Sequence, residues 1–206
     1  MESDKMVRKP KQKRSINTKE KILEAALKLF CEEGYYKTTT NEIAKVAEIS
    51  IGSLYSYFKD KDAIFLEILG RYNEMFNNAF NESAEDMSFY KSDKKAWLRK
   101  LIEEMIKIHE LSKEFNKEIK IMAYSRPEVA AISKKHRELS KKRTLTYLNQ
   151  CKENIKVKDI EAAAIVSFTL INSIVDHIVF EENEIDRERI IETTVEGLYK
   201  LLMFDE

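Results

Sequence analysis

The chain has 206 residues, carries 36 Lys and Arg against 36 Asp and Glu, and therefore has no net charge. Its four Gly and two Pro allow only a few short turns and cannot build a Gly-rich phosphate loop, and the rest of the composition favours an all-α fold. We find no secretory signal, no run of about 18 apolar residues and no cysteine motif, a combination typical of a cytoplasmic protein.

The charge is unevenly distributed along the chain. Residues 1–61 carry thirteen Lys and Arg against nine Asp and Glu, and eight of the basic residues fall within residues 5–21. We expect residues 1–15 to be a flexible basic tail, because they are polar and lack an apolar period. Such a tail either approaches a polyanion or is a solvated segment with no partner.

Residues 16–62 are expected to form three helices and the start of a fourth. The first runs from about residue 17 to Gly34, with apolar residues at helical spacing. Two short helices follow over about 39–47 and 51–57, and a long one covers about 61–82. Side chains able to cap a helix precede or begin each of the four: Asn17, Thr39, Ser50 and Asp60.

Residues 63–206 are expected to form a second, larger helical domain. Beyond the long helix we expect helices at about 93–113, 115–124, 127–152, 158–181 and 186–204, which makes about nine in the whole chain. Ser92 and Asp186 lie where caps are wanted, and Pro127 fits the first turn of its helix.

The two short helices are expected to bind DNA as a helix-turn-helix. They bury little surface alone and lean on the first helix, so the second of them presents small and polar side chains outward. Small residues there permit close approach to the groove, and hydroxyl and ammonium groups around it can donate to phosphates. The residues expected to contact DNA are Thr39, Thr40, Ile51, Gly52, Ser53, Tyr55, Tyr57, Lys59 and Lys61. The alternative is an ordinary helical hairpin with solvated side chains.

The literal sequence of this region favours DNA binding. The segment LFCEEGYYKTTTNEIAKVAEISIGSLYSYFKDKDAIF closely resembles the DNA-binding signature of TetR-family regulators. The matching positions are Phe30, Gly34, Tyr35, Thr39, Thr40, Ile43, Ala44, Ser50, Gly52, Leu54, Tyr55, Phe58, Lys59 and Lys61. Two positions depart from the family's pattern: Glu48 stands where the family often has Gly in the turn, and Tyr57 where it often has His.

The resemblance implies a homodimeric, ligand-responsive repressor. Its two helix-turn-helices would lie roughly 34–36 Å apart, as a palindromic operator in double-stranded DNA requires. A small, largely apolar effector would bind the C-terminal domain, push the long fourth helix and release the DNA, provided that it binds the released state more tightly. No cofactor is expected.

Two C-terminal helices are expected to build the dimer. Residues 160–180 are apolar nearly all round and need cover from several sides, and Gly197 interrupts an amphipathic final helix, as a close helix crossing would explain. Together they indicate half of a four-helix interface. The residues expected in it are Phe168, Ile171, Val175, Ile178, Gly197 and Leu201. The alternative is that both helices complete a monomeric core.

Aromatic, Met and polar side chains of the middle helices indicate an apolar ligand pocket between helices. The residues expected to line it are Trp97, Met105, His109, Met122, Tyr147, Phe168, Asn172 and Asp176. Each of them could instead be ordinary core. We expect no metal site, because His109 and His177 have no partner at ligand spacing.

Functions of other classes have less support in the sequence. We find no nucleophile–base pair, carboxylate dyad or metal cluster, and therefore do not expect an enzyme. A non-specific architectural DNA binder and a helical protein-interaction module remain as alternatives, which salt dependence and sequence preference of DNA binding would separate.

Overall fold

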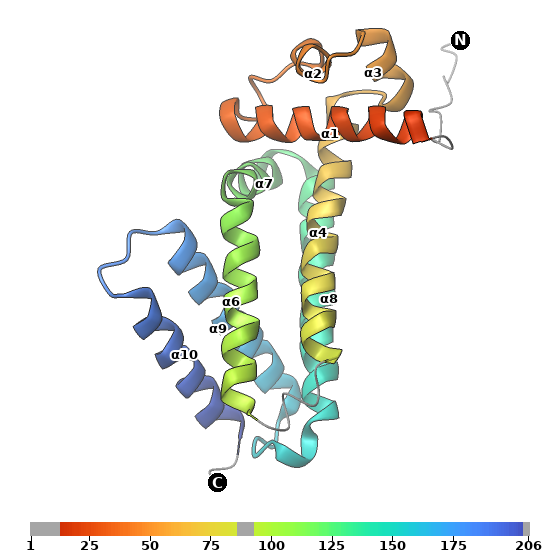
Figure 1. Cartoon of the computed structure of the whole chain (residues 1–206). Helices are drawn as coiled ribbons and strands as arrows, with labels where there is room; N and C mark the ends of the chain where they lie inside the picture. The colour runs from red at the N-terminus through yellow and green to blue at the C-terminus, as the bar shows by residue number, and fades with distance from the viewer. Residues whose placement is uncertain (1–12, 86–92, 204–206) are drawn as a thin grey trace. The chain divides into compact units, whose positions relative to one another are not determined.

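The computed structural model describes the backbone of residues 13–85 and 93–203, and the side chains of all of these except 13–15 and 79–85. This part of the chain forms nine α-helices and no β-strand, which confirms the all-α fold (Figure 1). The helices are α1 (Lys13–Glu33), α2 (Thr40–Val46), α3 (Ile51–Tyr57), α4 (Lys61–Glu85), α6 (Lys94–Leu111), α7 (Lys113–Ser125), α8 (Pro127–Gln150), α9 (Ile160–Phe180) and α10 (Arg187–Leu202). Most of the expected basic tail, 1–15, lies outside the described residues.

Capping side chains define most of the helix starts. Thr39 forms a capping box with Glu42, and the other expected caps that accept a main-chain N–H are Ser50, Asp60 and Asp186. The prediction for Asn17 is wrong, because α1 begins four residues earlier and Asn17 lies in its second turn. Asp93, not Ser92, caps α6, and Ser92 lies outside the described residues.

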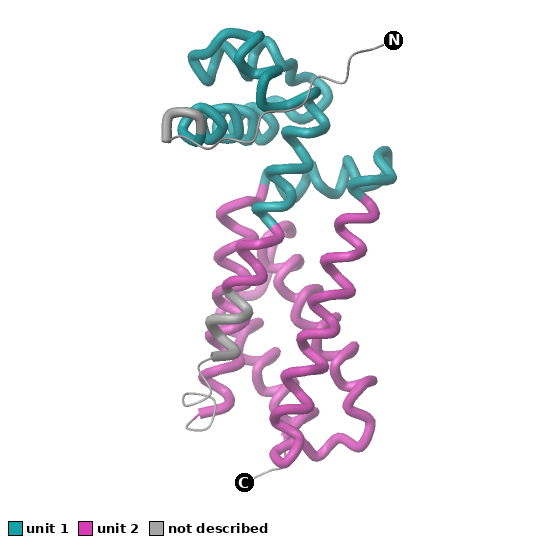
Figure 2. Tube along the Cα trace, turned by 90° about the vertical axis from the view of Figure 1, so that its right-hand side faces the viewer, with its two compact units in different colours: residues 1–72, 114–129 teal, residues 73–113, 130–206 magenta. Residues whose placement is uncertain are grey.

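Packing divides the chain into two compact units (Figure 2). Unit 1 comprises Met1–Tyr72 and Glu114–Val129, and unit 2 comprises Asn73–Lys113 and Ala130–Glu206. This division differs from the sequence division at residue 62 in two respects. The first three turns of α4 belong to unit 1, and so does α7, which joins it from a distant part of the sequence.

Unit 1 is built around a cluster of aromatic rings. The ring of Phe65 on α4 lies 5.6 Å from that of Phe30 on α1, 5.4 Å from that of Tyr35 and 5.3 Å from that of Phe115 on α7, measured between centroids. Helix α2 packs against α1, and α3 packs against α2. Leu54 of α3 is fully buried, which leaves the opposite face of this short helix for solvent.

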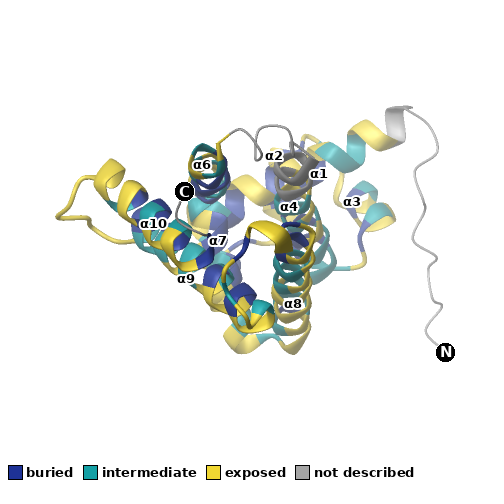
Figure 3. Cartoon of the chain, turned by 90° about the horizontal axis from the view of Figure 1, so that it is seen from below, coloured by how far each residue is buried: buried dark blue, intermediate teal, exposed yellow. Residues whose placement is uncertain are grey.

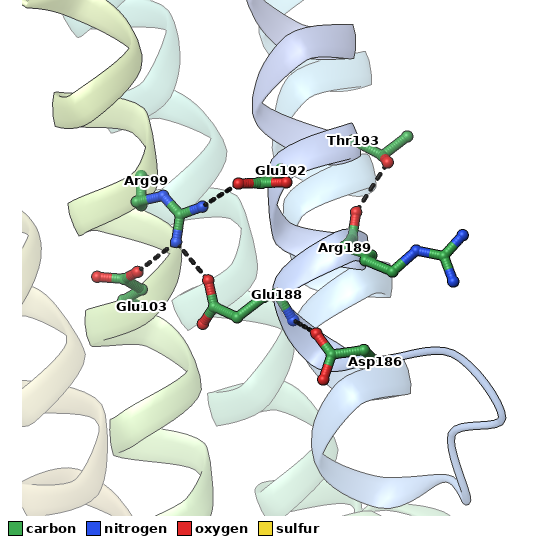
Figure 4. Close-up of polar contacts among 7 residues, drawn as sticks. All are labelled: Arg99, Glu103, Asp186, Glu188, Arg189, Glu192 and Thr193. Atoms are coloured by element: carbon green, nitrogen blue, oxygen red, sulfur yellow. Dashed lines mark hydrogen bonds and ion pairs between the residues drawn. The ribbon is translucent and has the colours of Figure 1, made fainter.

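Unit 2 has its core where α6, α9 and α10 lie side by side (Figure 1). Ile102, Val175 and Leu198, one from each helix, are fully buried there. A polar seam joins α6 to α10 beside this core. Arg99 contacts Glu103 on its own helix and Glu188 and Glu192 on α10, at 3.0, 2.7 and 3.5 Å (Figure 4).

Helix α9 has the length and mean hydropathy, 1.7, of a membrane-spanning helix, the one such case among the described residues. The sequence, which lacks an unbroken run of about 18 apolar residues, predicts none. A third of its apolar window is buried inside the chain, where it packs against α6 and α10 as a core helix does. The rest of the helix includes exposed positions (Figure 3). Among them are Ile165 and Val166, which are 54% and 50% exposed.

Candidate functional site

The turn of the helix-turn-helix contains a residue in the left-handed conformation that is not a glycine. Glu48 has φ = 55°. Its N–H donates to the carbonyl of Lys45 at 3.1 Å, and the N–H of Ile49 donates to that of Ala44 at 3.0 Å, the bond pattern that usually ends on Gly. The turn therefore has the left-handed geometry for which Gly is the usual residue, at the steric cost that a Cβ adds there.

The exposed face of α3 combines small, polar and larger apolar residues: Ile51, Gly52, Tyr55 and Ser56. Ile51 and Tyr55 are 37% and 49% exposed. Gly52 is exposed too, and no atom lies within 4 Å of the position that a Cβ would take. Across the turn, the Thr40 hydroxyl and the Tyr55 hydroxyl share a hydrogen bond of 3.0 Å. With Thr40, the residues Ile51, Gly52 and Tyr55 form a continuous surface on α2 and α3, which a groove of DNA could approach closely.

Other predicted DNA contacts have local structural roles as well. The Thr39 hydroxyl donates to Glu42 at 2.8 Å, and the Ser53 main-chain N–H donates to the Ser50 hydroxyl at 3.1 Å. Tyr57 is half-buried at the end of α3. Lys59, by contrast, has a 74% exposed side chain whose nearest acid, Asp60, is 3.7 Å away.

The Lys61 side chain binds mainly to other groups of this chain. Its ammonium donates to the main-chain carbonyls of Tyr35 and Thr38, at 2.7 and 2.6 Å, and lies 4.2 Å from the centroid of the Tyr35 ring. Burial lowers the pKa of this ammonium below its ordinary value. Lys61 therefore stabilises the connection from α1 to α2, and its predicted role at a phosphate would be secondary to that.

The same connection is held by a buried phenol. The Tyr35 hydroxyl donates to Asp62 at the start of α4, and burial together with this carboxylate raises the pKa of Tyr35 well above its ordinary value. Arg126, which follows α7, lies 3.3 Å from the other oxygen of Asp62. These contacts hold the α1–α2 connection, α4 and the end of α7 together within unit 1.

Three exposed polar residues near this surface were missing from the sequence prediction: Lys37, Asn41 and Ser56. Lys37 and Asn41 flank the cap of α2, and Ser56 follows Tyr55 on α3. Their position beside the predicted Thr and Tyr residues is the signal that could have included them. All three can donate hydrogen bonds to phosphate oxygens.

The predicted pocket residues do not form one group. Trp97 and Tyr147 stack with ring centroids 4.6 Å apart in the core of unit 2, and Met122 is buried in unit 1. Phe168 and Asn172 are half-buried neighbours on α9, where the Asn172 amide donates to the Phe168 carbonyl. The residues that come together are Met105, His109 and Asp176, in unit 2.

His109 is the centre of that group. Its Nδ1 lies 2.8 Å from the Met105 carbonyl oxygen and its Nε2 lies 3.9 Å from Asp176. Its ring contacts Phe76 edge-on at a centroid distance of 4.9 Å. No group of three or more His, Cys, Asp or Glu able to hold a metal occurs among the residues that the structure covers.

The predicted dimer residues fall into two sets. Val175 and Ile178 are 0% and 8% exposed within the chain's own core, so the prediction needs correction for these two, which have almost no surface for a partner. Gly197 and Leu201 are exposed on α10, while Phe168 and Ile171 are half-buried. Gly197 has open space around it, so no helix crossing within the chain explains this glycine.

Two family models cover most of the chain. The model of bacterial regulatory proteins of the tetR family matches residues 22–68, and the model of the tetracyclin-repressor-like C-terminal domain matches residues 75–203. The second alone spans more than half of the chain.

Curated relatives match the N-terminal region. The HTH-type transcriptional regulator QacR of Staphylococcus aureus is 54% identical over 54 residues, which are 26% of this chain and 29% of QacR. AcrR of Shigella flexneri is 44% identical over 63 residues, 31% of this chain and 29% of AcrR. The matched region thus spans less than a third of the length of these curated relatives.

Solved structures of similar fold match nearly the whole chain. A putative TetR-family regulator from Mesorhizobium loti has a TM-score of 0.71 at 19% identity, over 94% of this chain and all of that one. SmeT, the repressor of the Stenotrophomonas maltophilia multidrug efflux pump SmeDEF, has a TM-score of 0.67 at 20% identity, over 92% of this chain and 93% of its own. With both family models matched, the chain belongs to the TetR family of bacterial transcriptional regulators.

Proposed function

We propose that this protein is a cytoplasmic, homodimeric repressor that binds a palindromic operator through α2 and α3 and leaves it when a small molecule binds unit 2. The observation that carries the proposal is the exposed surface of Ile51, Gly52 and Tyr55, with Thr40 bonded to Tyr55, on a helix-turn-helix whose turn has a left-handed residue at Glu48. The repressor role is further supported by SmeT, a repressor of the same fold.

Homodimer formation is supported by the outer faces of α9 and α10. Ile165 and Val166 are exposed on α9, with Thr169 and Ser173 one and two turns further along. On α10 the exposed positions Thr193, Gly197 and Leu201 recur every four residues. In Figure 4 Thr193 points away from the seam that Arg99 forms with Glu188 and Glu192 on α10. Gly197, four residues further along, has no atom within 4 Å of an added Cβ. Two such faces together would form a four-helix interface.

Coupling between effector and DNA is assigned to α4. This helix is continuous from Lys61 to Glu85 and has residues in both compact units. In unit 1, α4 binds α1 through two ion pairs. Arg71 donates two hydrogen bonds to the Glu20 carboxylate, and the Lys19 ammonium lies 2.7 Å from a carboxylate oxygen of Glu67. A shift of α4 in unit 2 would therefore carry the helix-turn-helix with it. An effector drives that shift only as far as it binds the DNA-free state more tightly.

The first experiment is selection from random duplex DNA by the purified full-length protein, followed by sequencing of the retained DNA. Recovery of a palindromic motif supports a dimeric operator-binding protein. Binding with a steep salt dependence but no motif would instead indicate an architectural DNA binder, and no binding at all would indicate a protein-interaction module.

Two glycine variants make this selection specific to α3. Gly52 and Gly70 are both exposed, both helical and both in unit 1, with no atom within 4 Å of the added Cβ. Gly52→Leu should abolish recovery of the motif, because the added bulk would hold α3 off the groove floor. Gly70→Leu should retain it. Equal behaviour of the two variants would contradict the assignment of α3 as the reading helix.

A further inference from the structure

One face of α8 in unit 2 is polar where a core-facing helix is normally apolar. Ser133, His136, Ser140 and Arg143 recur at spacings of three and four residues, and all four are half-buried. Leu148 and Tyr147 restore the apolar pattern only at the C-terminal end of the helix. Such a spacing places the four polar side chains in one row along α8.

The row contains one buried polar group without a hydrogen-bond partner among the described residues. The Ser133 hydroxyl oxygen is shielded from solvent and makes no hydrogen bond to them. The half-buried His136 imidazole makes none either, and its ring contacts that of Phe76, 5.9 Å away between centroids. Buried polar groups in native proteins are nearly always satisfied, so the Ser133 hydroxyl calls for an explanation.

Among the four residues of the row, Arg143 has the most unusual environment for a charged side chain. Its guanidinium donates to the side-chain carbonyl of Asn77 on α4, a neutral partner, and within the described part of the chain no carboxylate pairs with it. The other half-buried arginines whose side chains the structure describes behave differently: Arg71, Arg99 and Arg126 each pair with a carboxylate. A partly desolvated cation without an anion is costly, so an anion that arrives from outside would be strongly favoured here.

Aromatic surface adjoins this polar row. Phe76 precedes Asn77 on α4, and its ring lies between the imidazoles of His136 and His109, at 5.9 and 4.9 Å. The Phe180 ring lies 6.4 Å from that of His109. The Asp176 carboxylate lies 3.9 Å from Nε2 of His109, so it has a potential cationic partner of its own. The region thus offers apolar ring faces beside a cation that no carboxylate of the described side chains compensates.

We propose that the effector of this regulator is an amphipathic organic acid, whose carboxylate binds Arg143 with support from His136 and whose apolar part lies against Phe76 and Phe180. The inference rests on the proposed function and names the chemical class of its effector. A guanidinium fork can bind a carboxylate through two parallel N–H donors, which gives orientation as well as affinity. The opposite class, an organic cation, would place a second positive charge beside Arg143.

The test is direct binding of defined probes to the DNA-free, full-length protein by isothermal titration calorimetry. The acid probes are the saturated carboxylates from butanoate to dodecanoate, with benzoate and phenylacetate. The matched probes of other charge are 1-octanol and octylamine. We expect at least one carboxylate to bind and the alcohol and amine to bind at least tenfold more weakly than the acid of equal length. Tighter binding of octylamine, or no binding by any carboxylate, would overturn the assignment.

Variants on the same helix locate the site. Arg143→Gln should weaken binding of the best carboxylate by about tenfold or more, because it removes a charge-assisted hydrogen bond. Arg143→Lys should recover part of it. Arg137→Gln, which changes an exposed arginine two turns away, should leave binding unchanged. Equal affinity of the Arg143→Gln variant and the parent would overturn the proposal.

Two further measurements distinguish a ligand-binding role of Arg143 from a structural one. If Arg143 serves a ligand, Arg143→Gln should leave the melting temperature of the ligand-free protein unchanged or higher, whereas a clear loss of stability would assign Arg143 a structural role. Operator binding by the Arg143→Gln variant should be intact in the absence of acid. A parent protein that binds its operator but no carboxylate would overturn the ligand class alone and leave the proposed function standing.

Discussion

Glu118 on α7 accepts a hydrogen bond of 2.9 Å from the main-chain N–H of Tyr35, the residue directly after Gly34. Gly34 has φ = 85° and ends α1, so this carboxylate is bound at the point where the chain turns toward the helix-turn-helix. Eighty-three positions separate the two partners in the sequence. The contact explains why α7 packs as part of unit 1.

Removal of this carboxylate should loosen α7 from unit 1. Glu118→Ala should lower the free energy of unfolding by about 1 kcal/mol, since it leaves the partly buried N–H of Tyr35 without an acceptor. Glu118→Gln should lose less, because an amide oxygen still accepts. Urea denaturation measures both changes. Glu114→Ala is the control on the same helix, where an exposed ion pair with Lys117 is lost and only a few tenths of a kcal/mol are expected. Equal losses at 114 and 118 would contradict the proposed anchor.

The helices of this chain could be predicted from sequence because their signals are local. Apolar spacing and caps such as Ser50, Asp60 and Asp186 depend on residues three or four positions apart, and these predictions agree with the structure to within a few residues. The start of α1 was missed because Asn17 and Glu20 have capping-box spacing but lie inside a helix that continues toward the N-terminus. A cap acts only where the helix actually begins.

The composition of each packed unit could not be predicted in the same way. Met122 was assigned to the ligand pocket, yet it is buried in unit 1, because α7 joins that unit through tertiary contacts that no local pattern encodes. Val175 and Ile178 were assigned to the dimer, since an apolar helix shows no difference in sequence between its inner and its outer side. The sequence did not single out Arg143, because its distinguishing feature is that it bonds to a neutral amide and to no carboxylate among the described side chains, which only a structure can reveal.

The two left-handed residues of unit 1 should respond oppositely to substitution. Glu48→Gly should raise the free energy of unfolding by up to about 1 kcal/mol, because glycine adopts φ near 55° without the strain of a Cβ. Gly34→Ala should lower it by a similar amount for the same reason, at φ = 85°. Thermal unfolding of the two single variants against the parent is the measurement. A lower melting temperature for Glu48→Gly would mean that the Glu48 side chain has a contact worth more than the strain.

Lys59 and Lys61 should differ in what they stabilise, although both were predicted to contact phosphate. Lys59→Gln removes an exposed charge, so it should weaken operator binding and reduce the slope of log K against log salt by about one, with little change in melting temperature. Lys61→Gln breaks the bonds to the carbonyls of Tyr35 and Thr38 and should mainly lower the melting temperature. Fluorescence anisotropy at several salt concentrations and thermal unfolding separate the two effects. A Lys61→Gln variant of unchanged stability and reduced salt slope would restore Lys61 as a phosphate contact.

The dimer should depend on the exposed half of α9. Ile165→Glu places a charge at a 54% exposed position that the proposed interface would bury without a partner, so the variant should sediment as a monomer at concentrations where the parent is dimeric. Leu139→Glu on α8 is the control, a similar change at a 43% exposed position outside the interface. Sedimentation velocity measures the oligomeric state. If the Ile165→Glu variant is still a dimer, the interface does not include this face of α9.

Acid should destabilise the ligand-free protein partly through His136. Burial, with a smaller effect of Arg143, holds the pKa of this imidazole below its ordinary value. As the pH falls through about 6.5, the unfolded chain therefore binds a proton at this position before the folded chain does. The stability that neutral His136 provides is complete above that pH and is lost progressively below it, down to the folded-state pKa.

The melting temperature of His136→Gln should consequently fall less between about pH 7.5 and pH 5 than that of the parent. His177→Gln, which changes a more exposed imidazole beside Glu181 on α9, should retain the His136 contribution. If His136→Gln and the parent lose stability in parallel over this range, His136 is not a source of the acid sensitivity.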